Sequence, residues 1–167
     1  MISTLTLVFF SFLFTGDTAS YEPFHVDLTK LFGVARLAVL DAPDRVETFR
    51  VKGVQAPSGT SRTLVGYPIL KQGPDLNVNQ VAAMHRLIFD PQNHPPIVSS
   101  CIFEPGIVLR YSKGKSTVLI LLCFKCQDWL FVGQGEDIVQ TFSHLAGDLG
   151  RIAKALFPKD PAIQALP

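Results

Sequence analysis

The spacing of apolar residues predicts two amphipathic helices. Over residues 75–89, apolar side chains recur every three or four positions, Asn77 and Gln80 form a predicted capping box, and Pro91 ends the pattern. The same spacing over residues 135–157 puts six large apolar side chains on one stripe. A stripe of this kind is typical of a helix packed on a sheet, so we expect both helices to cover one.

Apolar runs without that spacing predict β-strands, above all in the C-terminal half. Residues 107–111, 116–124 and 129–132 are such runs, and the first two are separated by a Ser-Lys-Gly-Lys turn. The middle run is apolar on both faces, which is typical of a central strand covered from each side. Together the three runs predict an antiparallel meander. A two-residue loop at Lys113-Gly114 sets a register that places Cys101 opposite Cys126.

The N-terminal half has weaker patterns. Residues 45–54 and 64–70 read as strands, separated by a loop rich in Pro, Gly and Ser. Residues 32–40 fit a buried strand or a short helix. Strands come in runs and are not regularly alternated with helices, so the expected fold class is α+β: a mostly antiparallel sheet with a C-terminal three-strand meander and two packed amphipathic helices.

The extreme N-terminus has the pattern of an export signal. Residues 2–14 are almost continuously apolar and are followed by small polar residues up to Ser20. The run is shorter than the roughly 20 apolar residues of a membrane-spanning helix. We therefore predict a signal peptide or an uncleaved N-terminal anchor over residues 1–20 and a single domain over residues 21–167, in a secreted or periplasmic protein. A buried N-terminal strand is the alternative, and only an uncleaved segment would bring the chain to a membrane.

Composition narrows the classes of partner. The chain has 167 residues, of which 47% are apolar and 17% charged, so it has enough core-forming residues for one domain. Its 15 basic residues nearly balance its 14 acidic ones, and no basic run is interleaved with aromatic residues. This argues against a nucleic-acid partner and leaves another protein as the expected one.

Three cysteines carry the most specific chemistry in the chain. Cys101, Cys123 and Cys126 lie within one apolar stretch, and the last two form a C-x-x-C pair. With an export signal, a structural disulfide between Cys101 and a member of that pair is the favoured interpretation, and Cys123 is expected to be buried and inert. Free-thiol counting should then find one thiol per chain.

Two further interpretations of the cysteines stay open, beside the simple one that all three are small buried residues. A thiol–disulfide oxidoreductase would use Cys123 and Cys126, although the helix that usually follows a redox C-x-x-C is not predicted here. A small structural zinc site would use the three cysteines with His85 or His94 as fourth ligand. We expect His85 to be a core residue of its helix and His94 to be solvated in a proline-rich loop.

No sequence motif identifies a catalytic site or a cofactor. The chain has no P-loop, G-x-S-x-G or H-E-x-x-H motif, so we assign no catalytic residue and expect no cofactor. The sequence favours an exported, non-enzymatic module that binds or scaffolds another protein and has a structural disulfide. The thiol–disulfide oxidoreductase and the structural zinc protein are the alternatives.

Overall fold

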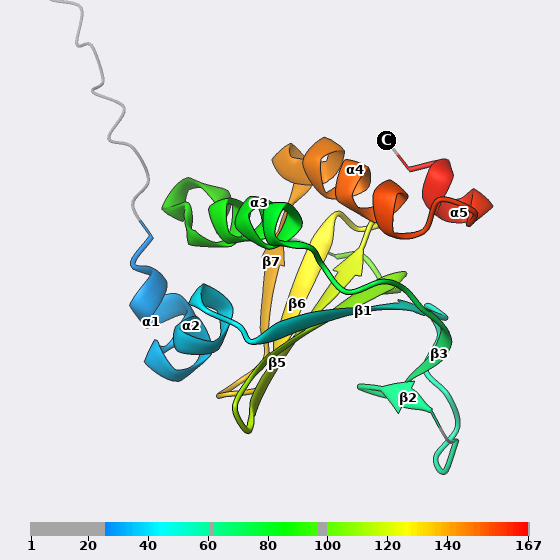
Figure 1. The fold of residues 1–167 in the computed structure, drawn as a ribbon, viewed down its shortest axis with the longest axis horizontal. Helices are drawn as coiled ribbons and strands as arrows, with labels where there is room; N and C mark the ends of the chain where they lie inside the picture. The colour runs from blue at the N-terminus through cyan, green and yellow to red at the C-terminus, as the bar shows by residue number, and fades with distance from the viewer. Residues whose placement is uncertain (1–25, 61, 97–99, 167) are drawn as a thin grey trace, which may run out of the picture.

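A computed structural model describes residues 26–60, 62–96 and 100–166, and the predicted export signal lies outside these residues. The described chain is an α+β fold built on one curled, seven-stranded antiparallel sheet with the strand order β2-β3-β1-β4-β5-β6-β7 (Figure 1). The strands are β1 (Arg45–Val51), β2 (Thr63–Leu64), β3 (Tyr67–Gln72), β4 (Ile107–Lys113), β5 (Ser116–Cys123), β6 (Asp128–Val132) and β7 (Ile138–Thr141). The predicted meander is β4-β5-β6, and β7 extends it by one strand.

All the helices lie on one side of this sheet (Figure 1). They are α1 (Leu28–Phe32), α2 (Val34–Asp41), α3 (Val78–Phe89), α4 (Ala146–Leu156) and α5 (Pro161–Gln164), with short 3-10 turns at Pro91–Asn93 and Ser143–Leu145. The capping box predicted at the start of α3 is present, because Asn77 and Gln80 exchange side-chain and backbone hydrogen bonds.

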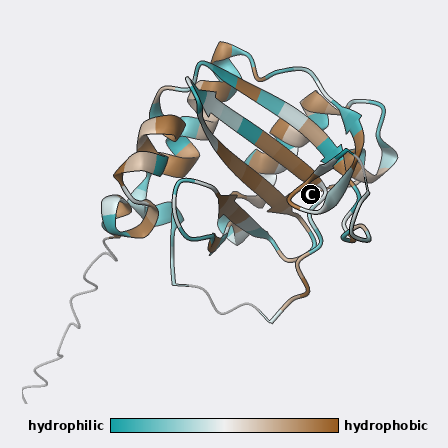
Figure 2. Ribbon diagram, turned by 90° about the horizontal axis from the view of Figure 1, so that it is seen from below, coloured by the Kyte–Doolittle hydropathy of each residue, from teal (hydrophilic) through white to brown (hydrophobic). Residues whose placement is uncertain are grey.

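The two faces of the sheet carry separate apolar clusters. The larger cluster contains buried side chains from each of the five helices. These pack against Trp129 and Phe131 of β6 and against Phe142 after β7, and we call this side the helix-covered face. The second cluster is built around Phe49, Val108 and Leu121 and contains no residue from a helix. We call this side the open face; Figure 2 looks onto it and shows apolar stretches along the central strands with no helix in front of them.

The structure corrects the predicted helix over residues 135–157. Residues 138–141 are strand β7, which pairs with β6, and the helix begins only at Ala146. A four-residue spacing between Ile138 and Phe142 fits a strand as well as a helix, since four is a multiple of the two-residue strand period. Before β7, Gly133 and Gly135 have φ of 98° and 136°, so the chain reverses there instead of starting a helix.

Two smaller expectations also change. The segment at residues 32–40, for which a strand and a helix were both open, forms the end of α1 and most of α2. The β4–β5 loop consists of Gly114 and Lys115, not Lys113 and Gly114, because Lys113 pairs with Ser116. This shifts the register by two residues from the predicted one, although each residue keeps its face because the strand period is two.

Candidate functional site

The open face leaves an apolar surface in water at one end of the sheet. On the central strands of the open face, Leu121 and Val108 are fully buried by neighbouring side chains. Nearer to β7, the apolar side chains of this face are only partly buried. Val139 is 43% exposed and pairs with Leu130, which is only partly buried. With their neighbours they form what we call the exposed patch, made of Leu119, Leu130, Val132 and Val139.

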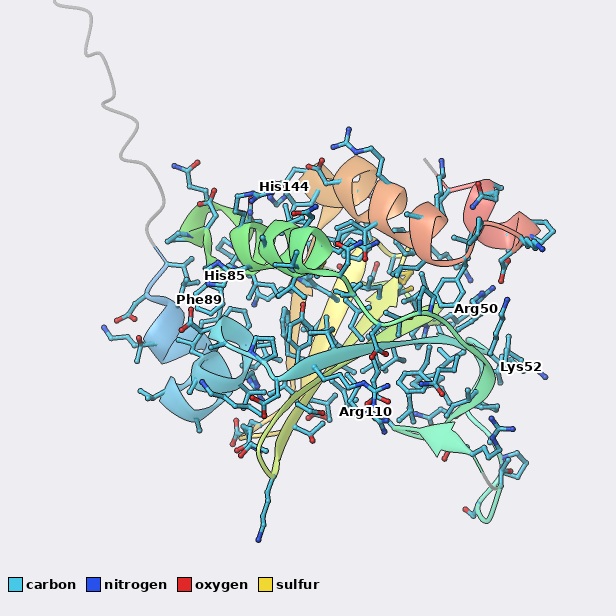
Figure 3. The ribbon with its side chains drawn as sticks, in the orientation of Figure 1. Arg50, Lys52, His85, Phe89, Arg110 and His144 are labelled. Atoms are coloured by element: carbon cyan, nitrogen blue, oxygen red, sulfur yellow. A yellow bond between two sulfur atoms is a disulfide. The ribbon has the colours of Figure 1, made fainter. Side chains whose placement is uncertain are left out.

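A charged cluster borders this patch on β1 and β4. Arg110 lies beside Leu119 across the β4–β5 ladder, and its guanidinium group donates to the Glu47 carboxylate at 2.6–2.7 Å. The same guanidinium lies 5.0 Å from the centre of the Phe49 ring, a cation–π arrangement. Figure 3 shows Arg110 on the side of the sheet away from α3 and α4. The patch therefore has a polar border whose charges are already held in place by β1.

A disulfide ties the turn after β5 to the segment that leads into β4. Cys101 and Cys126 are bonded, with their Cα atoms 5.6 Å apart, as the favoured interpretation of the sequence expected. The predicted β-ladder is not the reason, because pairing ends at Ile107 and Leu122 and Cys101 lies in a loop. The bond instead holds this loop against the end of the sheet.

The third cysteine is a buried thiol beside that bond. Cys123 has no exposed surface, and its sulfur accepts hydrogen bonds from the backbone N–H groups of Glu104 and Cys126, each at 3.4 Å. Glu104 is three residues after one end of the disulfide, and Cys126 is the other end. The thiol therefore contacts both segments that the disulfide joins.

The tethered segment also forms one wall of a shallow groove on the open face. The groove has a volume of about 310 Å³, and Ile102, Phe103 and Glu104 line one side of it. Val54 and Tyr67 also line the groove, and both Val54 and Ile102 are well exposed. Since Phe103 also packs in the open-face cluster, the disulfide positions an apolar feature of the surface.

The histidines occupy other places than the sequence suggested. His85 is not a core residue: its side chain is 38% exposed, its Nε2 lies 2.9 Å from Oδ1 of Asp41, and its ring stacks on Phe89 (Figure 3). His94 is not solvated but buried, with Nε2 2.7 Å from the carbonyl oxygen of Ile88. Neither histidine joins the cysteines.

No metal centre is formed among the described residues. Within them, no group of three or more His, Cys, Asp and Glu side chains is placed to hold an ion. Cys101 and Cys126 are bonded to each other, so two of the three thiolates of the predicted zinc site are not available to bind a metal ion. The predicted zinc ligands, which were the three cysteines with His85 or His94, therefore do not come together while this disulfide is present.

His94 belongs to the core under α1. Its ring packs edge-on against Phe32 and stacks on Trp129, with centroid distances of 4.9 and 5.7 Å. Burial lowers the pKa of His94 from its usual value, and the nearby His144 lowers it further, while the Ile88 carbonyl and Asp90 oppose the shift. A neutral imidazole in this position supports packing rather than proton transfer.

The exposed patch and its charged border were missed by sequence reasoning. The apolar run in β5 was interpreted as covered on both faces, whereas Leu119 keeps part of its surface in water. The available signal was Arg110, which breaks the apolar run of β4 on the same face as Leu119. A charge in that position indicates that the face is open near it.

Comparison of the chain with protein-family models, with curated proteins and with solved structures gives no match. Among the described residues, no helix has the length and apolar character needed to cross a membrane. The disulfide indicates a non-reducing compartment. The two faces of the sheet and the cysteine cluster are the features of the described residues that bear on function.

Proposed function

We propose that this protein is an exported, non-enzymatic module that binds another protein through the exposed patch on the open face of its sheet. The observation that carries the proposal is the difference in cover between the faces. Helices cover the sheet side of one apolar cluster, whereas the other cluster contains no helix residue and ends in Leu119, Leu130, Val132 and Val139, which remain in contact with water.

The composition of this surface supports a protein partner. Protein interfaces commonly have an apolar centre surrounded by a polar rim, with arginine and aromatic residues enriched at the positions that contribute most to binding. Here the apolar centre is the exposed patch, and Arg110 stacks over Phe49 at its border. Because Glu47 holds the Arg110 guanidinium, this side chain loses little conformational freedom when a partner docks.

The disulfide and the N-terminal sequence support export. A Cys101–Cys126 bond persists in oxidising compartments, and residues 2–14 have the length and composition of a signal-peptide core. Both point to a protein that works outside the reducing cytoplasm.

The binding role is tested by charge substitutions on opposite sides of the molecule. Val139→Glu places a carboxylate in the exposed patch, and Val78→Glu places one on the solvent side of α3, where the side chain is 80% exposed. In capture experiments with the extracellular fraction of the producing cells, we expect one set of partners to be lost with Val139→Glu and retained with Val78→Glu. Equal capture by both variants contradicts the proposal.

A separate assay tests the enzymatic alternative. A thiol–disulfide oxidoreductase that acts on other proteins would reduce insulin with turnover dependent on its cysteines. We expect no insulin reduction above background by the wild-type protein, and no difference from Cys123→Ser. Turnover that Cys123→Ser abolishes would replace the binding role with the oxidoreductase role.

A further inference from the structure

The C-x-x-C turn joins a thiol and a disulfide in one short segment. Cys123 is the last residue of β5, and the N–H of Cys126 already lies 3.4 Å from its sulfur. Cys126 is bonded to Cys101, which is exposed, whereas Cys123 is completely buried. The Cys123 thiol, a possible nucleophile, therefore lies in the same turn as the Cys101–Cys126 bond, three residues before Cys126.

The backbone holds the Cys123 sulfur in place beside the disulfide. Two backbone N–H groups, from Glu104 and Cys126, donate to this sulfur. One of the two donors belongs to Cys126, so the thiol is fixed next to the residue whose sulfur it would attack.

A buried carboxyl group faces the thiol from the next strand. Asp128 is directly opposite Cys123 in the β5–β6 ladder, so both side chains lie on the open face, and Asp128 is only 3% exposed. Its position next to a buried thiol suits a group that accepts the thiol proton.

We propose that Cys123, Cys126, Cys101 and Asp128 form a site for intramolecular thiol–disulfide exchange. Asp128 accepts the proton of Cys123, and the Cys123 thiolate attacks Sγ of Cys126. A Cys123–Cys126 bond forms while the Cys101–Cys126 bond breaks, and the electron pair of the broken bond leaves with Cys101, which takes up the proton. One disulfide and one thiol are present before and after, so the step needs no external oxidant or reductant.

The exchange regulates the open face. It releases Cys101 and with it the restraint on Ile102 and Phe103, which line the groove. The consequence for a partner rests on the proposed binding role, whereas the exchange itself depends only on the cysteine cluster. In the exchanged form we expect the wall of the groove to become movable.

Native-state alkylation with a bulky, water-soluble maleimide tests the exchange. The structure exposes Cys101 only as part of a disulfide and buries the one free thiol, so a static protein takes up no label. We expect slow labelling of the native protein at Cys101, with a Cys123–Cys126 disulfide in the labelled product, both located by peptide mapping. No label, or label on Cys123, overturns the proposal.

Two substitutions assign the roles. Cys123→Ser removes the nucleophile and should abolish labelling of Cys101. Asp128→Asn should slow it by at least about a hundredfold, the lower end of the range for loss of a general base, while Asp137→Asn in the exposed β6–β7 loop leaves the rate unchanged. Labelling of Cys101 that persists in Cys123→Ser contradicts the mechanism.

The outcome is independent of the binding assay. Labelling uses the purified chain without a partner, so its failure does not affect the comparison of Val139→Glu with Val78→Glu. Conversely, a chain that binds nothing can still exchange its disulfide.

Discussion

The two faces of the sheet use similar apolar residues with opposite results. On the helix-covered face, Trp129 and Phe131 are fully buried under helices. On the open face, Leu130 and Val132 of the same strand keep part of their surface in water. The alternation of side chains along β6 thus divides one strand into a core face and a surface face.

This difference shows which residues stabilise the fold and which remain for function. Contact with the helices removes the apolar surface of one face from water, and this contributes most of the hydrophobic free energy of folding. The open face contributes less and is held by the Arg110–Glu47 pair and the Cys101–Cys126 bond.

The largest expected effect is on the helix-covered face. Trp129→Ala should lower the free energy of unfolding by about 3–5 kcal/mol, because it leaves a cavity among Phe131, Phe142 and His94. The adjacent Leu130→Ala should cost only about 1 kcal/mol, since that side chain is only partly buried. Urea unfolding of both variants measures the contrast, and equal losses would mean that both faces are core.

The disulfide should account for the next largest effect. Its two cysteines are 25 residues apart in sequence, and closing a loop of this length stabilises a fold by about 3 kcal/mol in the chain-entropy model. Cys101→Ser and Cys126→Ser should each show this loss in urea unfolding. Cys123→Ser, which leaves the bond intact, should show a smaller one.

Packing at the edge of the helix-covered face predicts a smaller loss. A Cβ atom at Gly73 would lie 2.5 Å from Oγ1 of Thr48 and 2.9 Å from the Phe157 ring. Gly73→Ala should therefore destabilise the protein by about 1–3 kcal/mol. Gly147→Ala is the matched control: nothing lies within 4 Å of its Cβ position in α4, so the change should stabilise the helix by up to about 1 kcal/mol. Thermal unfolding of both variants should shift in opposite directions.

The smallest effect is a pH dependence that belongs to the helix-covered face. Burial lowers the pKa of His94 in the folded state, so below about pH 6.5 the unfolded chain binds more protons than the folded one. Stability contributed by the neutral imidazole is complete above that pH and is lost as the pH falls toward the lowered pKa.

Urea midpoints at pH 7.5, 6.5 and 5.5 measure this loss. His94→Phe should make the urea midpoint less dependent on pH. His85→Phe, on the half-exposed surface of α3, should leave that pH dependence unchanged. A dependence unchanged by His94→Phe would contradict the assignment of the acid sensitivity to His94.

The sequence predicted the elements whose signals are local and missed those set by distant contacts. The capping box of α3 and the runs of β4, β5 and β6 were readable because each depends on neighbouring residues. The sequence pattern predicts a helix where β7 lies, because the spacing of Ile138 and Phe142 fits both the helix and the strand period, and only pairing with β6 decides between them.

The same limit applies to the candidate site. Cysteine spacing and the predicted export signal favoured the disulfide, although the register used to align Cys101 with Cys126 was wrong by two residues. The exposed patch could not be predicted, because strand patterns show which residues share a face but not which face the helices cover. That choice depends on where α2, α3 and α4 dock.

Site-specific photo-crosslinking tests the binding role of the open face most directly. A photoreactive phenylalanine analogue at Val139 lies in the exposed patch, and the same analogue at Val78 lies on the outer surface of α3. In the producing cells, irradiation should yield a discrete protein adduct at position 139 and none at position 78. No adduct at position 139, or the same adduct at both positions, would contradict a protein-binding role for the open face.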